Sequence, residues 1–595
     1  MEKQNKVWIF TFEYAGVAKF GGLGEVPANQ VKSISDSFDI SVIMPSHGQV
    51  EKLKGLYEWR KYPFNCVGQI NTEQIGFEIS ERSYNISFYE FRIGKAKVIL
   101  LSGDNDFTRN FLDQSTIYSP DTFRGKICFF SLGIRCLVKY LIDSNKSELP
   151  NIVHLHDYHV VIPFINTKQV LIENGQDIAS IITIHLLTYP QLDLNYFYTC
   201  GVNNSPISVR LKEGIKFFTM EEIFKLASES ENIPSVEKIG AVISDIVTTV
   251  SQSYLISDII PNCGKDLIEF KADFIWDGCD WDYYEIFDDV MNKHDANIRH
   301  VLNISEDIPL SKRDMKKYLL EFKIGHLSQS PLIQSSKVLK TINEISNGNP
   351  FIKNGTILPF SSYGPLLITT GRISPQKGFE IILQAIPAVI EKIPDMKFLF
   401  LILPTDYSLN EIKYYASYVK KYPDNLRIIF GVASDIFYLA HLAADVYCAL
   451  SRWEPFGIMA LEAMASKLPV IATRVGGLQE TIIDIRDYPK IGTGILIEKD
   501  NTKQFEEAVI SIIKAAQVAH KAKKPVEPIS SDVEMLNIVN QIPDAAIKSN
   551  VLLNPRFYEE IKENCYKRVK QNFSWKKVSQ KLVELYLKLF KMQLK

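Results

Sequence analysis

Two glutamates frame a segment whose residue types suit the binding of a sugar. Residues 454–462 read Glu-Pro-Phe-Gly-Ile-Met-Ala-Leu-Glu, and a Gly-Gly pair ending at Gly477 follows one predicted strand later. We expect Glu454 where a strand ends in a loop, and Glu462 about two turns into the next helix, so that both carboxylates face one cleft. This spacing alone is also typical of two surface acids. The Pro-x-Gly inside the segment and the later Gly-Gly loop favour a binding site.

Two cations lie in a second segment, which reads Gly-Arg-Ile-Ser-Pro-Gln-Lys-Gly over residues 371–378. It follows a predicted strand and precedes a predicted helix, which is where open α/β sheets bind ligands. Arg372 supplies a planar fork of donors and Lys377 a compact charge, so the pair can neutralise a leaving diphosphate without a metal ion. A solvated basic turn is the alternative, and the position in the fold favours phosphate binding.

A glycine-rich segment near the start of the chain reads Lys-Phe-Gly-Gly-Leu-Gly-Glu-Val over residues 19–26. It follows the first predicted strand and opens a helix, where small residues let the backbone approach a ligand and free amides suit a phosphate. Gly21 and Gly22 do not have the spacing of a P-loop or of the dinucleotide fingerprint. Two interpretations stay open: a phosphate cradle, or a tight turn that needs small residues.

Histidines gather at the ends of two further strands. Residues 154–159 read His-Leu-His-Asp-Tyr-His, and His185 ends the next predicted strand. Three histidines could ligate zinc, but their alternation along the strand and the lack of other nearby ligand candidates argue against a metal. We expect hydrogen bonds to a sugar, or buried polar groups that are satisfied within the protein.

The elements that must position these residues form two similar series of apolar, β-branched runs. The runs are Val7–Phe12, Ile40–Pro45, Lys97–Leu101, Asn151–Leu155, Ile178–Ile184 and Asp245–Val250, then Pro365–Thr370, Met396–Leu403, Leu426–Gly431, Asp445–Leu450, Leu468–Thr473 and Gly494–Ile497. Continuously apolar runs separated by helices such as Lys377–Lys392 are typical of parallel strands buried on both faces. The sequence therefore predicts an α/β fold with two Rossmann-like domains, whose parallel sheets face an interdomain cleft.

The length of 595 residues also requires more than one domain, because a single core stops growing near roughly 250–300 residues. We expect an N-terminal domain over residues 1–325, a Ser/Asn/Gly-rich connection or insertion over 326–363, and a C-terminal domain over 364–572 that carries a surface insertion at 521–554. The tail, 573–595, predicts an amphipathic helix with Val578, Leu582, Leu585 and Leu589 on one face, which packs back on the N-terminal domain.

Charge and cysteine usage exclude several classes of function. The 67 Lys and Arg residues nearly balance the 69 Asp and Glu residues, so the sequence predicts no net positive field that would attract nucleic acid. The eight cysteines include no Cys-x-x-Cys pair, which disfavours a zinc ribbon, a redox motif or a disulfide framework. No apolar run approaches the ~20 residues of a membrane span, and the polar start is not a signal peptide. We therefore expect a cytoplasmic protein with no membrane or nucleic-acid partner.

Taken in order, these segments resemble the glycogen and starch synthase family of retaining glycosyltransferases, which have the GT-B fold. The resemblance also includes residues 106–129 and Phe573-Ser574-Trp575, and so spans most of the chain. It implies a retaining hexosyltransferase in which residues 1–325 bind the acceptor and residues 364–572 bind the donor. The family's catalytic positions fall on Glu454, Arg372, Lys377, His185 and Asp157. Its substrate-binding positions fall on Lys19, Gly21, Gly22, Glu25, Glu462, Gly457 and Gly477.

The resemblance also implies a role for each group. Gly21 and Gly22 would approach the donor phosphates, and Lys19 would add positive charge nearby. Arg372 and Lys377 would stabilise the departing nucleoside diphosphate. Glu454 would lie beside the transferred glucose, and Glu462 would hold the donor ribose. Asp157 and His185 would contact the glucose from the opposite wall.

The implied reaction transfers glucose, with retention, from ADP-glucose or UDP-glucose to the non-reducing end of an α-1,4-glucan. A nucleotide-sugar donor and an α-glucan acceptor are thus the expected partners, and no cofactor or metal is expected. A front-face displacement with an oxocarbenium-like transition state is the usual proposal for the family, and the protein's task in it is electrostatic.

The sequence departs from the family at several positions. Glu25 replaces an aspartate, Leu186 replaces the asparagine that usually follows the histidine, Asp277-Gly278-Cys279-Asp280 replaces Asn-Gly-Ile-Asp, and residues 403–406 lack a glycine-rich turn. These changes bear on the choice of donor base and on acceptor geometry. A same-fold transferase with a small acceptor, and a silent glycan-binding homologue, are the alternatives.

Overall fold

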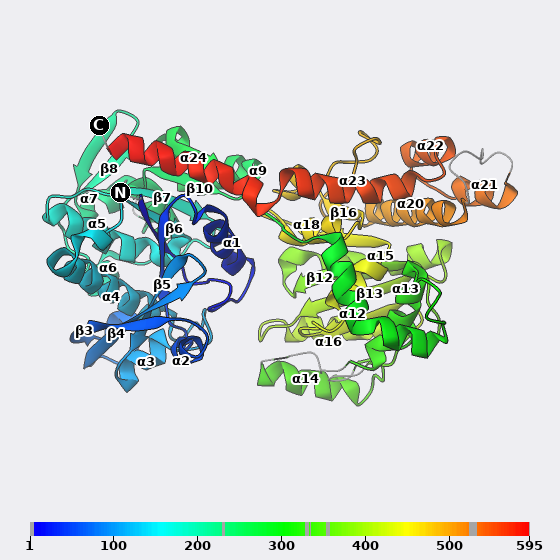
Figure 1. The fold of residues 1–595 in the computed structure, drawn as a ribbon, viewed down its shortest axis with the longest axis horizontal. Helices are drawn as coiled ribbons and strands as arrows, with labels where there is room; N and C mark the ends of the chain where they lie inside the picture. The colour runs from blue at the N-terminus through cyan, green and yellow to red at the C-terminus, as the bar shows by residue number, and fades with distance from the viewer. Residues whose placement is uncertain are drawn as a thin grey trace. The chain divides into compact units, whose positions relative to one another are not determined.

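The computed structural model describes residues 5–228, 232–327, 333, 335–352, 357–522 and 532–593 (Figure 1). The chain divides into two compact units. The first unit comprises Met1–Gly278 and Trp575–Lys595, and the second comprises Cys279–Ser574. Each unit is built around its own largely parallel sheet.

The sheet of the first unit has the strand order β11-β10-β7-β6-β1-β2-β5-β4-β3. Its strands are β1 (Lys6–Phe10), β2 (Asp39–Pro45), β3 (Trp59–Asn71), β4 (Glu81–Ile93), β5 (Ala96–Gly103), β6 (Ile152–His156), β7 (Ala179–Ile184), β10 (Ile246–Thr249) and β11 (Ala272–Phe274). The predicted runs of the first series fall on β1, β2, β5, β6, β7 and β10, which are largely apolar and buried. The short parallel strand β11 is half-buried and was not predicted. A separate hairpin pairs β8 (Ile207–Leu211) with β9 (Gly214–Phe218).

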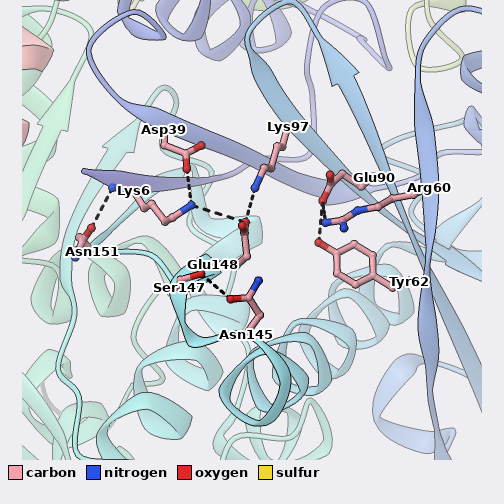
Figure 2. Close-up of polar contacts among 10 residues, drawn as sticks. All are labelled: Lys6, Asp39, Arg60, Tyr62, Glu90, Lys97, Asn145, Ser147, Glu148 and Asn151. Atoms are coloured by element: carbon pink, nitrogen blue, oxygen red, sulfur yellow. Dashed lines mark hydrogen bonds and ion pairs between the residues drawn. The ribbon is translucent and has the colours of Figure 1, made fainter. Parts of the chain in front are cut away.

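Two long strands extend this sheet in the antiparallel sense, which the sequence did not predict. β4 pairs antiparallel with both β5 and β3. Along β3 most side chains are exposed or half-buried, so no continuous apolar run marks it. Arg60 and Tyr62 on β3 bind one oxygen of Glu90 on β4, with its Oε2 lying 2.7 Å from Arg60 Nη2 and 3.0 Å from Tyr62 Oη (Figure 2).

The helices of the first unit cover its sheet and follow its strands. They are α1 (Glu25–Ile34), α2 (Val50–Lys54), α3 (Asp106–Leu112), α4 (Phe123–Ser144), α5 (Val161–Glu173), α6 (Leu194–Thr199), α7 (Met220–Ala227), α8 (Val236–Ile243), α9 (Gln252–Tyr254), α10 (Ile260–Cys263), α11 (Lys265–Ile268) and α24 (Trp575–Gln593). Helix α24 packs against α1, β6 and β7. Its predicted apolar face buries Leu582 and Leu589, and Tyr586 Oη lies 2.8 Å from His154 Nδ1.

Charged side chains cluster at the amino-terminal ends of the parallel strands of this sheet (Figure 2). Lys6 at the start of β1 pairs with Asp39 at the start of β2, and its Nζ lies 3.8 Å from Glu148 Oε2. Lys97 on β5 pairs with the same carboxylate. Burial acts to raise the pKa of Glu148, but the hydrogen bond and charge of Lys97 bring it below the usual value. The amino-terminal ends of β1, β2 and β5 are therefore occupied by internal ion pairs.

A disulfide joins Cys66 on β3 to Cys136 on α4, 70 residues apart in the sequence. The expectation that the cysteines form no disulfide is therefore wrong for this pair. The pairing depends on α4 packing across β3, which no local spacing of cysteines reveals. The other six cysteines are free and buried.

The sheet of the second unit has the order β14-β13-β12-β15-β16-β17, with every described pairing parallel. Its strands are β12 (Leu366–Arg372), β13 (Lys397–Leu403), β14 (Leu426–Phe430), β15 (Val446–Ala449), β16 (Val470–Thr473) and β17 (Gly494–Ile497). All six coincide with predicted runs. The strands are almost wholly buried, because helices lie on both faces.

The helices of the second unit lie on both sides of residue 325, where we expected the first domain to end. They are α12 (Tyr283–Leu302), α13 (Lys312–Glu321), α14 (Ser336–Ser346), α15 (Phe379–Lys392), α16 (Leu409–Lys421), α17 (Phe437–Ala443), α18 (Ile458–Ala465), α19 (Leu478–Thr481), α20 (Thr502–Lys521), α21 (Val533–Asn540), α22 (Ala545–Leu553) and α23 (Phe557–Asn572). Helices α12 and α13 pack against α17, so the units divide after residue 278 and not at the expected 325.

The two expected insertions are partly described. Helix α14 lies in 326–363 and packs against α16, while 328–332, 334 and 353–356 lie outside the described residues. Helices α21 and α22 lie in 521–554 and pack against α20, while 523–531 lie outside the described residues. The helices inside both ranges contribute buried side chains to the second unit.

No helix among the described residues is long and apolar enough to cross a membrane.

A buried ion pair ties α13 to the sheet of the second unit. Asp445, directly before β15, pairs with Lys316, and its Oδ1 lies 3.6 Å from Lys312 Nζ. The backbone amide of Leu366 donates to Oδ2 of the same carboxylate at 2.8 Å. Burial acts to raise the pKa of Asp445, but the charges of Lys316 and Lys312 outweigh it and lower the pKa to about 2.

We predict that Asp445→Asn destabilises the second unit by about 3–5 kcal/mol, because it leaves a buried ammonium without its counter-charge. Since the folded pKa is depressed, the contribution of Asp445 is present above pH ~4 and is lost as the pH falls towards 2. Calorimetric unfolding of the full chain measures both effects. Glu391→Gln, which breaks an exposed pair with Lys392, should leave the transition unchanged. Equal transitions for the two variants would contradict the prediction.

Candidate active site

The strand order of the second unit creates a topological switch between β12 and β15. From β12 the chain proceeds outward through β13 and β14, and then returns to β15 on the other side of β12. The helices that follow β12 and β15 therefore diverge, which leaves room for a ligand at the carboxyl ends of these two strands. The loops after both strands carry predicted site residues.

Lys377 and Glu454 meet at this switch. Lys377 lies in the 3₁₀ turn Pro375–Lys377 between β12 and α15, and Glu454 lies in the loop between β15 and α18. Lys377 Nζ is 2.6 Å from Glu454 Oε2, and Ser451 Oγ donates to the same oxygen at 2.9 Å. Both side chains are largely buried, at 14% and 10% exposed. A cation and an acid 77 residues apart thus form one polar centre.

Backbone contacts hold the two loops together. The Arg452 amide donates to the Gln376 carbonyl at 2.7 Å, and Gln376 Nε2 donates to the Trp453 carbonyl at 2.9 Å. Gly378 has a φ of 62°, and a Cβ there would lie 2.3 Å from the Leu450 carbonyl oxygen. Only glycine lets the turn after β12 come this close to the end of β15.

The glycines after Glu454 shape its loop. Gly457 is the N-cap residue directly before α18 and has a φ of 99°, and Gly477 donates its amide to the Glu454 carbonyl at 3.1 Å. A Cβ on neighbouring Gly476 would lie 1.9 Å from that same carbonyl oxygen. Gly457 and Gly477 therefore act here through backbone shape, by fixing where Glu454 stands.

Arg372 and Glu462 flank this centre. Arg372 is the last residue of β12 and its side chain is exposed. Glu462 lies on α18, which begins at Ile458, so this residue is little more than one turn into the helix. The expected two turns are wrong, because the Pro-x-Gly segment is loop and not helix.

The first unit has its own switch, between β1 and β6. The chain leaves β1 towards β2 and β5, and later returns to β6 on the other side of β1. The loop after β1 contains the glycine-rich segment, and the turn after β6 contains Asp157. These predicted residues are therefore also at the carboxyl edge of a parallel sheet.

A buried glutamate that the sequence analysis missed organises the glycine-rich loop. Glu13 Oε2 accepts the amides of Phe20 at 2.6 Å and Gly21 at 2.9 Å, and Oε1 accepts the Tyr118 hydroxyl at 2.6 Å. The Gly21 amide that we expected to face a phosphate is thus engaged by a carboxylate. Glu13 directly follows the predicted strand Val7–Phe12, which is the one signal that could have drawn attention to it.

Lys19 and Glu25 lie at the two ends of the same segment and pair with each other at the surface. Gly22 begins the short 3₁₀ turn Gly22–Gly24 that leads into α1, and Glu25 is the first residue of that helix. The loop therefore carries a half-exposed ion pair outside and the Glu13 carboxylate inside.

Asp157 and His185 are joined at the ends of β6 and β7. Asp157 has a φ of 62°, donates its amide to the Thr183 carbonyl at 3.0 Å and accepts the His185 amide on Oδ1 at 2.7 Å. Burial, with help from the charges of Glu237 and Glu13, raises the pKa of Asp157 to about 8. At pH 7 this carboxyl is mostly protonated, so it can donate a hydrogen bond as well as accept one.

The histidines beside Asp157 are buried and neutral. His185 Nε2 lies 2.9 Å from His156 Nδ1, and the two rings stack with centroids 5.2 Å apart. Burial lowers the pKa of His185 to about 3. His154 is satisfied by Tyr586 and by Thr183 Oγ1 at 2.7 Å, in keeping with an internal polar role. No cluster of three or more His, Cys, Asp or Glu side chains able to hold a metal occurs among the described residues.

Glu13 can be tested without any ligand. We predict that Glu13→Ala speeds hydrogen exchange at the amides of Phe20 and Gly21 at least tenfold, because both lose their acceptor. Hydrogen–deuterium exchange with mass spectrometry over residues 14–24 measures this. Lys19→Ala, which removes only the surface pair, serves as the control and should leave these amides protected. Unchanged exchange in Glu13→Ala would show that other contacts hold the loop.

Asp157 provides a prediction of pH dependence. Because its folded pKa is raised, the folded state retains a proton that the unfolded state has lost between pH ~4 and ~8, so its contribution to stability declines as the pH rises through this range. We predict that Asp157→Asn removes this pH-dependent contribution. The free energy of unfolding of the variant relative to the wild type should therefore be larger at pH 8 than at pH 5. Urea unfolding at both pH values measures it. A difference that is the same at both would contradict the assignment.

Comparisons with known proteins match a part of each unit. Residues 6–264 match the family model for the starch synthase catalytic domain, and residues 357–526 match the model for glycosyl transferases group 1. The chain is 25% identical over 503 residues to a glycogen synthase of Streptococcus agalactiae, covering 82% of this chain and 88% of that protein. It is 22% identical over 516 residues to a glycogen synthase of Exiguobacterium sibiricum, covering 85% and 90%.

Solved structures share the fold. The catalytic domain of starch synthase IV from Arabidopsis thaliana, bound to ADP and acarbose, has a TM-score of 0.62 at 17% identity and covers 98% of this chain and 99% of that one. A sucrose-phosphate synthase from Thermosynechococcus elongatus has a TM-score of 0.51 at 14% identity and covers 99% and 100%. At these identities the likeness establishes the GT-B fold.

Proposed function

Because this chain belongs to the glycogen and starch synthase family of glycosyltransferases, we propose that it transfers glucose, with retention, from a nucleoside diphosphate glucose to the non-reducing end of an α-1,4-glucan. The observation that carries the proposal is the contact of Lys377 with Glu454 at the switch between β12 and β15. This contact places a cation and an acid where α/β sheets receive nucleotide ligands.

The donor side of the reaction is assigned to the second unit. Lys377 and Arg372 follow one strand end, and we propose that they offset the charge of the departing diphosphate. Glu454 forms an ion pair with Lys377. A diphosphate that approaches Lys377 would share the ammonium with Glu454, whose other hydrogen bond comes from Ser451. Charge-assisted contacts of this kind strengthen as the leaving group gains charge.

Glu454 would then stand beside the transferred glucose. The glycines that hold its backbone leave little freedom to the loop, so its carboxylate is pre-positioned for a sugar hydroxyl. We assign Glu462, one turn along α18, to the ribose hydroxyls. Gly457 and Gly477 support substrate binding indirectly, since their contacts set the position of Glu454.

We assign uncharged, sugar-binding groups to the first unit. Asp157 is mostly protonated and His185 is neutral at pH 7, so both can exchange hydrogen bonds with glucose hydroxyls without repelling a diphosphate. Lys19, Gly21, Gly22 and Glu25 are assigned to the loop that borders the substrate. The Gly21 amide already donates to Glu13, so we assign phosphate binding to Lys377 and Arg372 and not to this loop. The loop would instead recognise the shape of the substrate.

Charge removal tests the donor assignment. We predict that Lys377→Ala and Arg372→Ala each lower kcat by about 10²–10³-fold, the size expected when one donor to a developing anion is removed. Lys392→Ala at the end of α15 removes an exposed lysine and is the control. Steady-state kinetics on variants with unchanged circular dichroism measure the effect. Near-wild-type turnover of folded Lys377→Ala would remove this residue from the mechanism.

The reaction itself is tested with labelled ADP-glucose and UDP-glucose, each with and without a glycogen primer. Label that enters polymer only when primer is present supports the proposed function, and the faster donor identifies the nucleotide. Label that enters only low-molecular-weight product would favour a small acceptor. Donor binding without any transfer would indicate a silent glycan-binding homologue.

A further inference from the structure

A pocket of about 260 Å³ lies on the first unit, away from the strand ends described above. Its wall comes from the β8–β9 hairpin, the starts of β10 and β11, and the end of α24. The lining residues are Arg210, Leu211, Lys212, Gly214, Asp245, Ile246, Phe270, Lys271, Lys588 and Met592. Figure 1 shows the C-terminal end of α24 beside this hairpin.

The pocket is at the amino-terminal edge of the sheet. Asp245 directly precedes β10 and Lys271 directly precedes β11, whereas His185 and Asp157 follow the carboxyl ends of β7 and β6. β10 is parallel to β7 and in register with it from Ile246, so the two edges are separated by the full length of a strand, roughly 13 Å for four residues. The pocket is thus distinct from the candidate active site.

The floor of the pocket is built from satisfied polar groups. Asp245 accepts the amide of Ser180 at 2.9 Å and Arg210 Nε at 3.1 Å. Lys271 Nζ donates to the carbonyls of Val242 and Ser244, both at 2.7 Å, and of Arg210 at 3.1 Å. The Asp245 carboxylate therefore orients the guanidinium of Arg210, and Lys271 holds the Arg210 backbone.

The mouth of the pocket carries positive charge that no described acid fully neutralises. Arg210 pairs with Asp245 through Nε. Its two terminal nitrogens donate to no group in the described part of the chain. Lys212 on the hairpin and Lys588 on α24 are exposed, and neither has an ion pair with any described residue. The lining thus contains one acid, Asp245, and four basic residues. Lys271 is held by backbone carbonyls, so Arg210, Lys212 and Lys588 supply the positive charge at the mouth, and they come from two elements far apart in sequence.

We propose that this pocket binds a small phosphate monoester, which bridges the β8–β9 hairpin and α24. The fork of Arg210 and the two ammonium groups match the oxygens of a phosphate dianion. Leu211, Phe270 and Met592 provide an apolar wall against which a compact carbon skeleton can pack. Phe270 is 40% exposed and so presents part of its ring for this contact.

Calorimetric titration of the full chain with ribose 5-phosphate and with inorganic phosphate tests the proposal. It is done in the double variant Lys377→Ala with Arg372→Ala, so that phosphate binding to these two residues at the candidate active site does not contribute. We expect saturable binding of ribose 5-phosphate and weaker binding of inorganic phosphate. Neutral ribose should not bind, because it lacks the dianion. No binding of either phosphate compound at millimolar concentration would overturn the proposal.

Variants locate the site without disturbing its buried floor. The double change Lys212→Gln with Lys588→Gln should weaken ribose 5-phosphate binding at least tenfold, because both residues are exposed and bind no other described group. Lys216→Gln, an exposed lysine on β9 outside the pocket, is the matched control and should bind as the parent does. Equal affinity of the double variant and the control would place the ligand elsewhere and refute the proposal.

Discussion

The contact between Lys377 and Glu454 depends on β12 and β15 being neighbours in a parallel sheet. The strands pair through Leu367 and Ile368, and their following loops are then bonded to each other through Gln376 and Arg452. Close approach at this point requires Gly378, since any side chain would strike the Leu450 carbonyl. The polar centre is thus a consequence of strand order, and a lysine and a glutamate at the same sequence positions would not meet in another topology.

In the first unit, strand order again brings polar residues together at one sheet edge, but there they are mostly uncharged. Its switch between β1 and β6 gathers Glu13, Asp157 and His185 at one sheet edge, where burial suppresses charge on the histidine and on the aspartate. The second unit keeps its charges and pairs them. Under the proposed function, the neutral Asp157 and His185 would contact sugar hydroxyls, and the paired Lys377 would contact a diphosphate. The Glu13 carboxylate shows that glycine-rich amides after a strand need not serve a phosphate.

Sequence patterns predicted the parallel framework well, because buried parallel strands are continuously apolar and easily recognised. They failed for β3 and β4, whose partly exposed faces break up the pattern. They placed Lys377 and Glu454 at strand ends, since loop and strand limits are local properties. They did not reveal Glu13, Tyr118 or the Cys66–Cys136 disulfide, because each depends on a partner brought in by packing. The two turns expected before Glu462 were wrong because residues 455–457 are loop, so that α18 begins only at Ile458.

The most direct test is a crystal structure of the protein with ADP or UDP bound. We predict that the diphosphate lies at the carboxyl ends of β12 and β15, with an oxygen roughly 3 Å from Lys377 Nζ. A diphosphate bound elsewhere, with the Lys377–Glu454 contact left undisturbed and remote from it, would contradict the assignment of this switch as the donor site.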